Sequence, residues 1–354
     1  MAKKRKTLPA DFEQIVTNAG SAELQAIFDK CDINAYGGFW KGNALTFCGI
    51  NEEFIQWLVT QGIDLNAGDT WGYRPVSYQA EYSSNNLKVL LELGADIEKR
   101  DNYNCTPLCN AVSKCHIQAV TALLENGADV HSLNGNGSDL MTPLEKGLAH
   151  CSNIDICKMA EIADMLLAAG AKTTPKMKNL VKKIGETFEF YRADFNKDYL
   201  PTTEQALEHL YHLFDAEPVA KRNIHNGIDP ILVKSSTWQQ QFAELWEMLI
   251  PGTGHAKTVQ GEVIRITGKV SREILDNGAP NWNKGYKKLP QALPMYFAMG
   301  NQLPPQEHEE ARSLSLSVSA NSEDDTLNRL CELAVWWVLL NPEPIALQGV
   351  DYER

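Results

Sequence analysis

The segment 251–282 carries the side chains best suited to chemistry. His255 and Glu262 lie close together in it, and an imidazole beside a carboxylate can exchange protons in general acid–base catalysis. Arg265 follows Glu262 by three residues, so on a helix the two can instead form an ion pair. The chain has no nucleophile elbow, phosphate-binding loop or HExxH motif, and QEHEEAR (306–312) has the wrong spacing for a zincin. We therefore favour a buried structural network over catalysis, and predict a non-enzyme without a cofactor.

The cysteines suggest neither disulfides nor a metal site. None of the eight forms a CxxC pair, and the chain is long enough to fold without covalent staples. One alternative is a metal site made by Cys105, Cys109, Cys115 and His116. The repeat pattern described below explains these positions without a metal, so we expect none. The cysteines are Cys31, Cys48, Cys105, Cys109, Cys115, Cys151, Cys157 and Cys331.

Composition narrows the functional class. The 354-residue chain can hold two domains, and its net charge of −12 argues against a general nucleic-acid binder and against binding to anionic membranes. Lys3, Lys4, Arg5 and Lys6 form one basic cluster, which could be a targeting signal or a nucleic-acid-binding arm. We favour a third interpretation, in which residues 1–6 are a disordered, solvated N-terminus.

Localisation follows from the apolar runs. No secretory signal is visible after the basic start, because the following residues carry acids and lack a continuous apolar run. The apolar run LAVWWVLL (333–340) is shorter than the ~20 residues needed to span a bilayer. We expect a cytoplasmic protein.

Two nearly identical segments indicate an internal repeat. LLELGADIEK (90–99) returns as LLENGADVHS (123–132), and Gly-Ala pairs occur at 94–95, 127–128 and 170–171, with a weaker form at 62–63. A second marker lies upstream in each repeat, at Pro75, Pro107 and Pro143. The Gly markers at 62, 94 and 127 are 32 and 33 residues apart, and the prolines are 32 and 36 residues apart, an interval typical of a solenoid.

The repeat resembles the ankyrin repeat, whose pattern is roughly D-x-x-G-x-T-P-L-H-x-A-x(12)-L-L-x-x-G-A-D-V-N-A. The best copy spans residues 101–132, and the resemblance covers about residues 7–173. It implies stacked helix pairs joined by β-hairpin loops, so the fold class is all-α, an ankyrin-repeat solenoid followed by a helical C-terminal domain. We count five repeats, with a degenerate first copy and a fifth copy stretched around 136–141 and 151–159: 7–35, 36–68, 69–100, 101–133 and 134–174.

The markers have physical roles in this fold. Thr106 and Pro107 open the first helix of the fourth repeat, because proline in the first turn loses no needed N–H group. Gly127 ends the second helix with left-handed backbone geometry that a Cβ atom would oppose. Cys109 replaces the family's usual histidine, and Cys115 falls near the turn between the helices.

Aromatic residues recur where ankyrin folds bind partners, which is on the hairpin tips and the exposed side of the first helices. Trp40, Trp71 and Tyr103 each lie four residues before the proline position of their repeat. Large exposed aromatics mark interfaces, although the C-terminal half of the chain could instead cover them. We favour an external protein partner. The predicted partner-binding residues are Phe39, Trp40, Trp71, Tyr73, Tyr82, Asn102, Tyr103, Ser113 and Lys114.

The chain from 175 to 354 is predicted to form a separate helical domain, so the expected division is 1–6, 7–174 and 175–354. Apolar residues at helical spacing predict helices over 175–195, 202–215, 236–250, 256–278 and 323–341. In the fourth of these, Gly261 and Gly268 are expected to let a neighbouring backbone approach closely.

The segment 251–282 resembles, loosely, one found in uncharacterised bacterial proteins, with the pattern P-x-x-G, T-x-x-G-E-x-I-R and N-G-x-x-N-W. This resemblance implies no established activity. The matching positions are Pro251, Gly254, Thr258, Gly261, Glu262, Ile264, Arg265, Asn277, Gly278, Asn281 and Trp282.

These observations favour a protein-binding module. The sharper hypothesis is a bacterial immunity or regulatory protein, whose acidic charge suits a basic toxin or effector as partner. The alternative is a delivered effector or an enzyme, in which the repeats select the substrate and the C-terminal domain carries an unrecognised activity. A solvent-open pocket containing His255 and Glu262 would favour the alternative.

Overall fold

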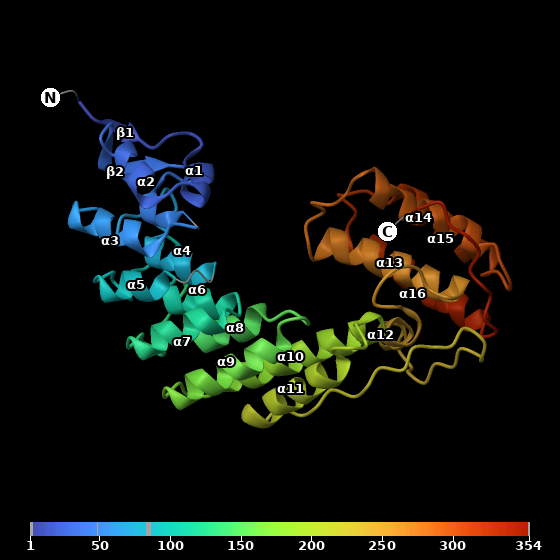
Figure 1. Ribbon diagram of the computed structural model, residues 1–354. Helices are drawn as coiled ribbons and strands as arrows, with labels where there is room; N and C mark the ends of the chain where they lie inside the picture. The colour runs from blue at the N-terminus through green and yellow to red at the C-terminus, as the bar shows by residue number, and fades with distance from the viewer. Residues whose placement is uncertain (1–2, 48, 83–85, 353–354) are drawn as a thin grey trace. The chain divides into compact units, whose positions relative to one another are not determined.

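The computed structural model describes residues 3–47, 49–82 and 86–352, so Cys48 lies outside the described residues. The chain divides into an N-terminal unit (Met1–Glu186 with Lys197–Pro218) and a C-terminal unit (Thr187–Asn196 with Val219–Arg354). Helices dominate both units, which confirms the all-α expectation (Figure 1). Within the described residues, no helix combines the length and apolar composition needed to cross a bilayer.

A small sheet opens the N-terminal unit. Strand β1 (Arg5–Thr7) pairs in parallel with β2 (Cys31–Gly37), which pairs antiparallel with β3 (Gly42–Asn43), while α1 (Phe12–Asn18) and α2 (Ser21–Ile27) connect β1 to β2. The expected disorder of residues 1–6 is therefore wrong for Arg5 and Lys6. Pairing with β2 satisfies the backbone there, and the Lys4 Nζ also donates to the Phe28 carbonyl at 2.7 Å.

The repeats form helix pairs whose first helices stack in sequence (Figure 1). Proline begins three of these first helices, and Thr106 accepts a hydrogen bond from the Cys109 N–H as the N-cap of its helix. Where Ala44-Leu45 replaces Pro-Leu, only a 3₁₀ turn forms. The pairs are η1 (Ala44–Thr46) with α3 (Glu52–Thr60), α4 (Pro75–Glu81) with α5 (Leu87–Glu92), α6 (Pro107–Ser113) with α7 (Ile117–Glu125), and α8 (Pro143–His150) with α9 (Ile156–Ala168).

Two further helices extend the N-terminal unit beyond the expected boundary at 174. Helix α11 (Leu200–Leu213) packs on α9 and buries Leu207 and Leu210. Most of α10 (Pro175–Tyr191) also belongs to this unit, and Gly185 leaves room for the Tyr211 ring of α11. The last repeat would otherwise expose an apolar face, so these helices cap the stack although they lack the repeat markers.

The C-terminal unit is built around one long helix, α13 (Val259–Leu275), nearly all of whose residues from 259 to 270 are buried. It packs against α12 (Trp238–Leu249), α14 (Lys284–Phe297) and α16 (Asp324–Leu340), while α15 (Pro305–Ser317) packs on α14 and α16. A 3₁₀ turn, η2 (Arg192–Asp194), also belongs to this unit. The sequence reading missed α14 and α15.

Some local expectations need correction. The helix expected over 202–215 begins at Leu200, and Thr203 is buried inside it. Gly261 and Gly268 do allow close packing, but against side chains instead of backbone. A Cβ on Gly268 would overlap the Trp246 ring, and one on Gly261 would lie 2.7 Å from the Ala256 Cβ.

Gly127 supplies a test of the repeat register. Its φ is +82°, and no heavy atom lies within 4 Å of an added Cβ, so a substitution there meets backbone strain alone. We expect Gly127→Val to lower the free energy of unfolding by about 1–2 kcal/mol, and Gly127→Asn by less because asparagine tolerates left-handed backbone. Urea denaturation measures both, with exposed Glu125→Ala as the control. Equal losses for valine and asparagine would contradict the assigned geometry.

Candidate functional site

In two repeats, an aspartate carboxylate fixes the hairpin tip on which a predicted partner-binding aromatic lies. In the third repeat, the Asp69 Oδ1 accepts a hydrogen bond from the Trp71 N–H at 2.8 Å. In the fourth, the Asp101 Oδ1 accepts one from the Tyr103 N–H, also at 2.8 Å. Each carboxylate accepts a second N–H two residues further on, so it closes a tight turn. The two tips therefore have the same backbone shape.

Adjacent hairpins are also bonded to one another. The Thr70 N–H donates to the Trp40 carbonyl, and the Asn102 N–H donates to the Trp71 carbonyl, both at 3.0 Å. In each tip, the residue after the aromatic has a positive φ, which is 59° at Lys41 and 75° at Gly72. This common geometry turns successive aromatic side chains toward the same side of the tips.

The result is a continuous aromatic row, formed by Phe39, Trp40, Trp71 and Tyr103. The Trp40 and Trp71 ring centroids are 5.9 Å apart, and the Trp71 and Tyr103 rings stack at 6.0 Å with only 11° between their planes. Phe39 packs edge-on against Trp40 at 4.4 Å. Within the described structure, Phe39 is 85% exposed and the other three are 44–51% exposed. The rings thus contact one another and still present a large apolar surface.

A second aromatic cluster lies on α4 and includes a residue that the sequence reading missed. Tyr78 contacts Tyr73 at 5.6 Å and stacks on Tyr82 at 6.2 Å, and its hydroxyl donates to Asp69. Tyr82 is 58% exposed, as expected, but Tyr73 is half-buried. Burial, followed by the nearby Glu81 carboxylate, raises the pKa of Tyr73. The i, i+4 spacing of Tyr78 and Tyr82 was the available signal.

The three polar residues among the predicted partner-binding residues lie in two different places. Asn102 is exposed and lies on the hairpin tip beside Tyr103. Ser113 and Lys114 lie at the end of α6, where the Ser113 hydroxyl donates to the Cys109 carbonyl at 2.7 Å and the Lys114 Nζ lies 3.3 Å from a Glu81 carboxylate oxygen. Asn102 thus accompanies the aromatic row, whereas Ser113 and Lys114 lie apart from the hairpin tip.

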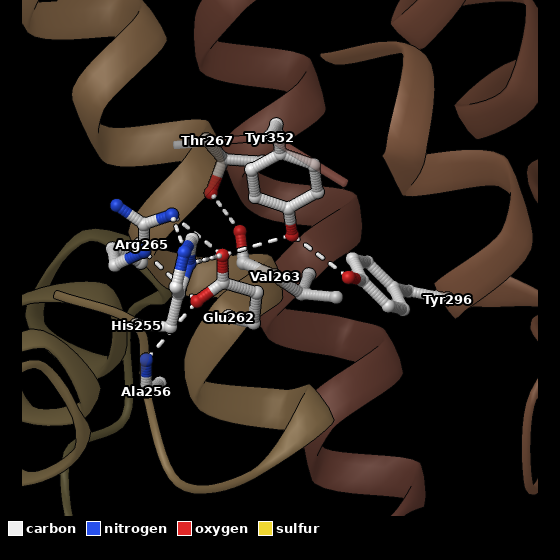
Figure 2. A network of polar contacts seen from close by, with 8 residues as sticks. All are labelled: His255, Ala256, Glu262, Val263, Arg265, Thr267, Tyr296 and Tyr352. Atoms are coloured by element: carbon white, nitrogen blue, oxygen red, sulfur yellow. Dashed lines mark hydrogen bonds and ion pairs between the residues drawn. The ribbon is translucent and has the colours of Figure 1, made fainter. Parts of the chain in front are cut away.

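The candidate acid–base residues form a buried network in the C-terminal unit (Figure 2). The fully buried Glu262 carboxylate receives the Arg265 Nη2 and Nε donors at 2.6 and 2.8 Å and the Ala256 N–H at 3.1 Å. The Tyr352 hydroxyl donates to it at 2.9 Å and lies 2.7 Å from the Tyr296 hydroxyl. Tyr352 and Tyr296 were not predicted, because they come from distant segments and carry no local motif.

This arrangement suits Glu262 to a structural role, in which its carboxylate clamps several segments together, better than to the role of a general base. Burial alone would raise the pKa of Glu262, but the hydrogen bonds and charge of Arg265, with donors from Ala256 and His255, lower the pKa below its ordinary value. General base catalysis favours a pKa near the working pH. The His255 Nδ1 lies 3.1 Å from Glu262 and 3.0 Å from Arg265, so the network already engages the imidazole.

The cysteines of the fourth repeat occupy packing positions. Cys105, Cys109 and Cys115 are all buried, and Cys115 has a φ of 54° in the turn between α6 and α7. Among the described residues, no group of three or more histidine, cysteine or acidic side chains is placed to hold a metal ion.

Known proteins resemble part of this chain. The ankyrin-repeat family model matches residues 43–134 with three copies. An ankyrin repeat protein of Fowlpox virus (strain NVSL) is 38% identical over 50 residues, which cover 14% of this chain and 19% of the viral protein. The chain therefore contains ankyrin repeats, which indicate a protein–protein interaction module. The family match over 43–134 includes Trp71 and Tyr103 of the aromatic row but not Phe39 or Trp40.

The buried network predicts a stability effect that depends on pH. Glu262→Gln leaves the Arg265 charge buried without its carboxylate, which typically costs 3–5 kcal/mol, so we expect a clear fall in the unfolding temperature of the C-terminal unit at pH 7. The pKa of Glu262 is lower in the folded protein than its ordinary value of 4.5, which applies to the unfolded chain. The ionised carboxylate therefore stabilises the wild-type protein above about pH 4.5, and this stabilisation is lost as the pH falls through the folded pKa.

A matched control is available in the same unit. Glu309 and Arg312 form an exposed pair at the same spacing, so Glu309→Gln should change the unfolding temperature little. Calorimetry of the three proteins between pH 3 and 7 makes the comparison. Equal effects of the two substitutions, or a Glu262→Gln effect independent of pH, would count against the clamp.

Proposed function

We propose that this protein binds a protein partner through the aromatic row, with Phe39, Trp40, Trp71 and Tyr103 as the central contacts. The observation that supports this most strongly is the row itself, a line of mutually contacting rings that stays 44–85% exposed on the tips of successive repeats. Trp and Tyr supply most of the binding energy at protein interfaces, and exposed apolar surface of this extent favours an interaction site.

The row is also organised before binding. Ring-to-ring contacts restrict the side chains, and the aspartate-closed turns restrict the backbone beneath them. Little conformational entropy then remains to be lost when a partner docks, which increases the affinity gained per contact. Asn102 would add a polar contact at the edge of the row, and Tyr82 could extend the surface along α4. Tyr73, Ser113 and Lys114 are more peripheral candidates, since each is already engaged within the unit.

We further propose that the partner is a basic protein, with a toxin or effector neutralised in the cytoplasm as the leading example. The net charge of −12 would attract a basic partner over a long range and raise the rate of encounter. In this reading the protein acts as an immunity or regulatory protein by covering a surface of its partner, with the aromatic row as the anchor.

Substituting the central tryptophan tests the proposal. Trp71→Ala should weaken partner binding by about 2 kcal/mol or more, roughly thirtyfold, while leaving the fold nearly as stable. Tyr199→Ala is the matched control, because Tyr199 is a 63% exposed aromatic of the same unit outside the row. Wild type, Tyr199→Ala and Trp71→Ala are each used as bait for affinity purification from the native cell. The partner should be retained by wild type and by Tyr199→Ala, and lost with Trp71→Ala. Calorimetric titration of the purified partner then gives the affinities.

Two outcomes would contradict the proposal. If Trp71→Ala binds the purified partner as tightly as wild type, the row is not the interface. If Trp71→Ala unfolds at a markedly lower temperature with no partner present, the ring supports the fold instead. The stretched loop around 136–141 of the fifth repeat would then be the next surface to test.

A further inference from the structure

The C-terminal unit contains a cavity of about 240 Å³ beside α13, separate from the aromatic row. Arg265, Lys269 and Arg272 line one wall, at positions i, i+4 and i+7, so they follow one face of the helix. The rest of the lining includes rings from α10, α12 and α14 and residues of the loop that follows α12. The aromatic lining residues are Phe190, Tyr191, Trp246 and Tyr286.

The charge of this wall is positive although the whole chain is acidic. Glu262 neutralises Arg265, and the only carboxylate in the lining is Glu273. Glu273 is 2% exposed and accepts the Asn281 N–H at 2.6 Å and the Asn277 and Asn281 side-chain amides at 3.2 Å. Besides the Glu262–Arg265 pair, the described lining holds two cations, Lys269 and Arg272, and one carboxylate, Glu273, so its net charge is positive.

Aromatic packing positions Arg272 in this wall. The Arg272 guanidinium lies 4.9 Å from the Trp246 ring centroid, and the Phe190 ring stacks on Trp246 at 6.4 Å with 16° between planes. Such contacts limit the motion of an otherwise flexible arginine. The cavity thus combines positioned cations with an apolar ring surface, the usual composition of a small-molecule site.

We propose that this cavity binds a small organic anion, a carboxylate or a phosphate monoester carried on a planar ring. The anionic group binds Lys269 and Arg272, because charge-assisted hydrogen bonds from cations to such oxygens are strong. The ring packs against the aromatic wall. The volume suits a ligand with a single ring, since cavities for larger drug-sized molecules begin at about 300 Å³. The inference is independent of partner binding at the aromatic row.

Calorimetric titration with simple probes tests the chemistry. Phenyl phosphate and benzoate share a ring and differ in the anion, inorganic phosphate lacks the ring, and benzyl alcohol lacks the charge. We expect phenyl phosphate or benzoate to bind most tightly, and the better of the two identifies the anion. Lys269→Met and Arg272→Met should each weaken that binding by about tenfold or more. Lys284→Met, a change at an exposed lysine outside the cavity lining, should leave the affinity unchanged.

A second measurement locates the site without relying on the variants. The indole N–H resonance of Trp246, assigned with Trp246→Phe, should shift during titration of the wild-type protein with the tighter probe. The proposal is overturned if no probe binds at about 10 mM, if benzyl alcohol binds as well as the anions, if Lys269→Met folds and binds normally, or if the Trp246 resonance stays fixed while a probe binds.

Discussion

A buried or half-buried carboxylate that accepts several N–H donors organises each unit of this molecule. In the N-terminal unit, Asp69 and Asp101 each accept two backbone donors and so set the shape of their hairpins. If these turns opened, the aromatic that follows each aspartate would lose its orientation and its ring contact with the adjacent repeat. The exposed row therefore depends on polar contacts beneath it as much as on the rings themselves.

The C-terminal unit uses the same chemistry at greater depth. Glu262 joins α13, the loop before it, α14 and the segment that contains Tyr352, because its donors come directly or through Tyr352 from all four. Such a site is costly to bury, and its stability requires every partner to be in place. The saturated carboxylate and the cationic cavity share Arg265, so the clamp also shapes one wall of the proposed ligand site.

Local patterns predicted most of the N-terminal unit and, in the C-terminal unit, α12, α13 and α16 but not α14, α15 or the buried network. Pro107 and Gly127 have fixed roles at helix ends, so their recurrence indicated the helix pairs, and the register of Trp40, Trp71 and Tyr103 indicated their common edge. Helix α14 carries Pro290 and Pro294 in its interior, where proline opposes a helix, and burial of Leu289, Leu293 and Phe297 outweighs the lost hydrogen bonds. Tyr352 and the cavity depend on tertiary contacts that no local pattern encodes.

The path of the segment that follows α16 affects the order in which the two units are completed. The Gln260 side chain bonds the carbonyls of Asn341 and Glu343 and the Ile345 N–H, and Tyr352 reaches Glu262. The core around α13 can close only after residues 341–352 have been synthesised, long after α13 itself. Each repeat, by contrast, needs only its immediate neighbours. During synthesis the repeats can therefore fold first, while the apolar face of α13 stays uncovered and open to chaperones.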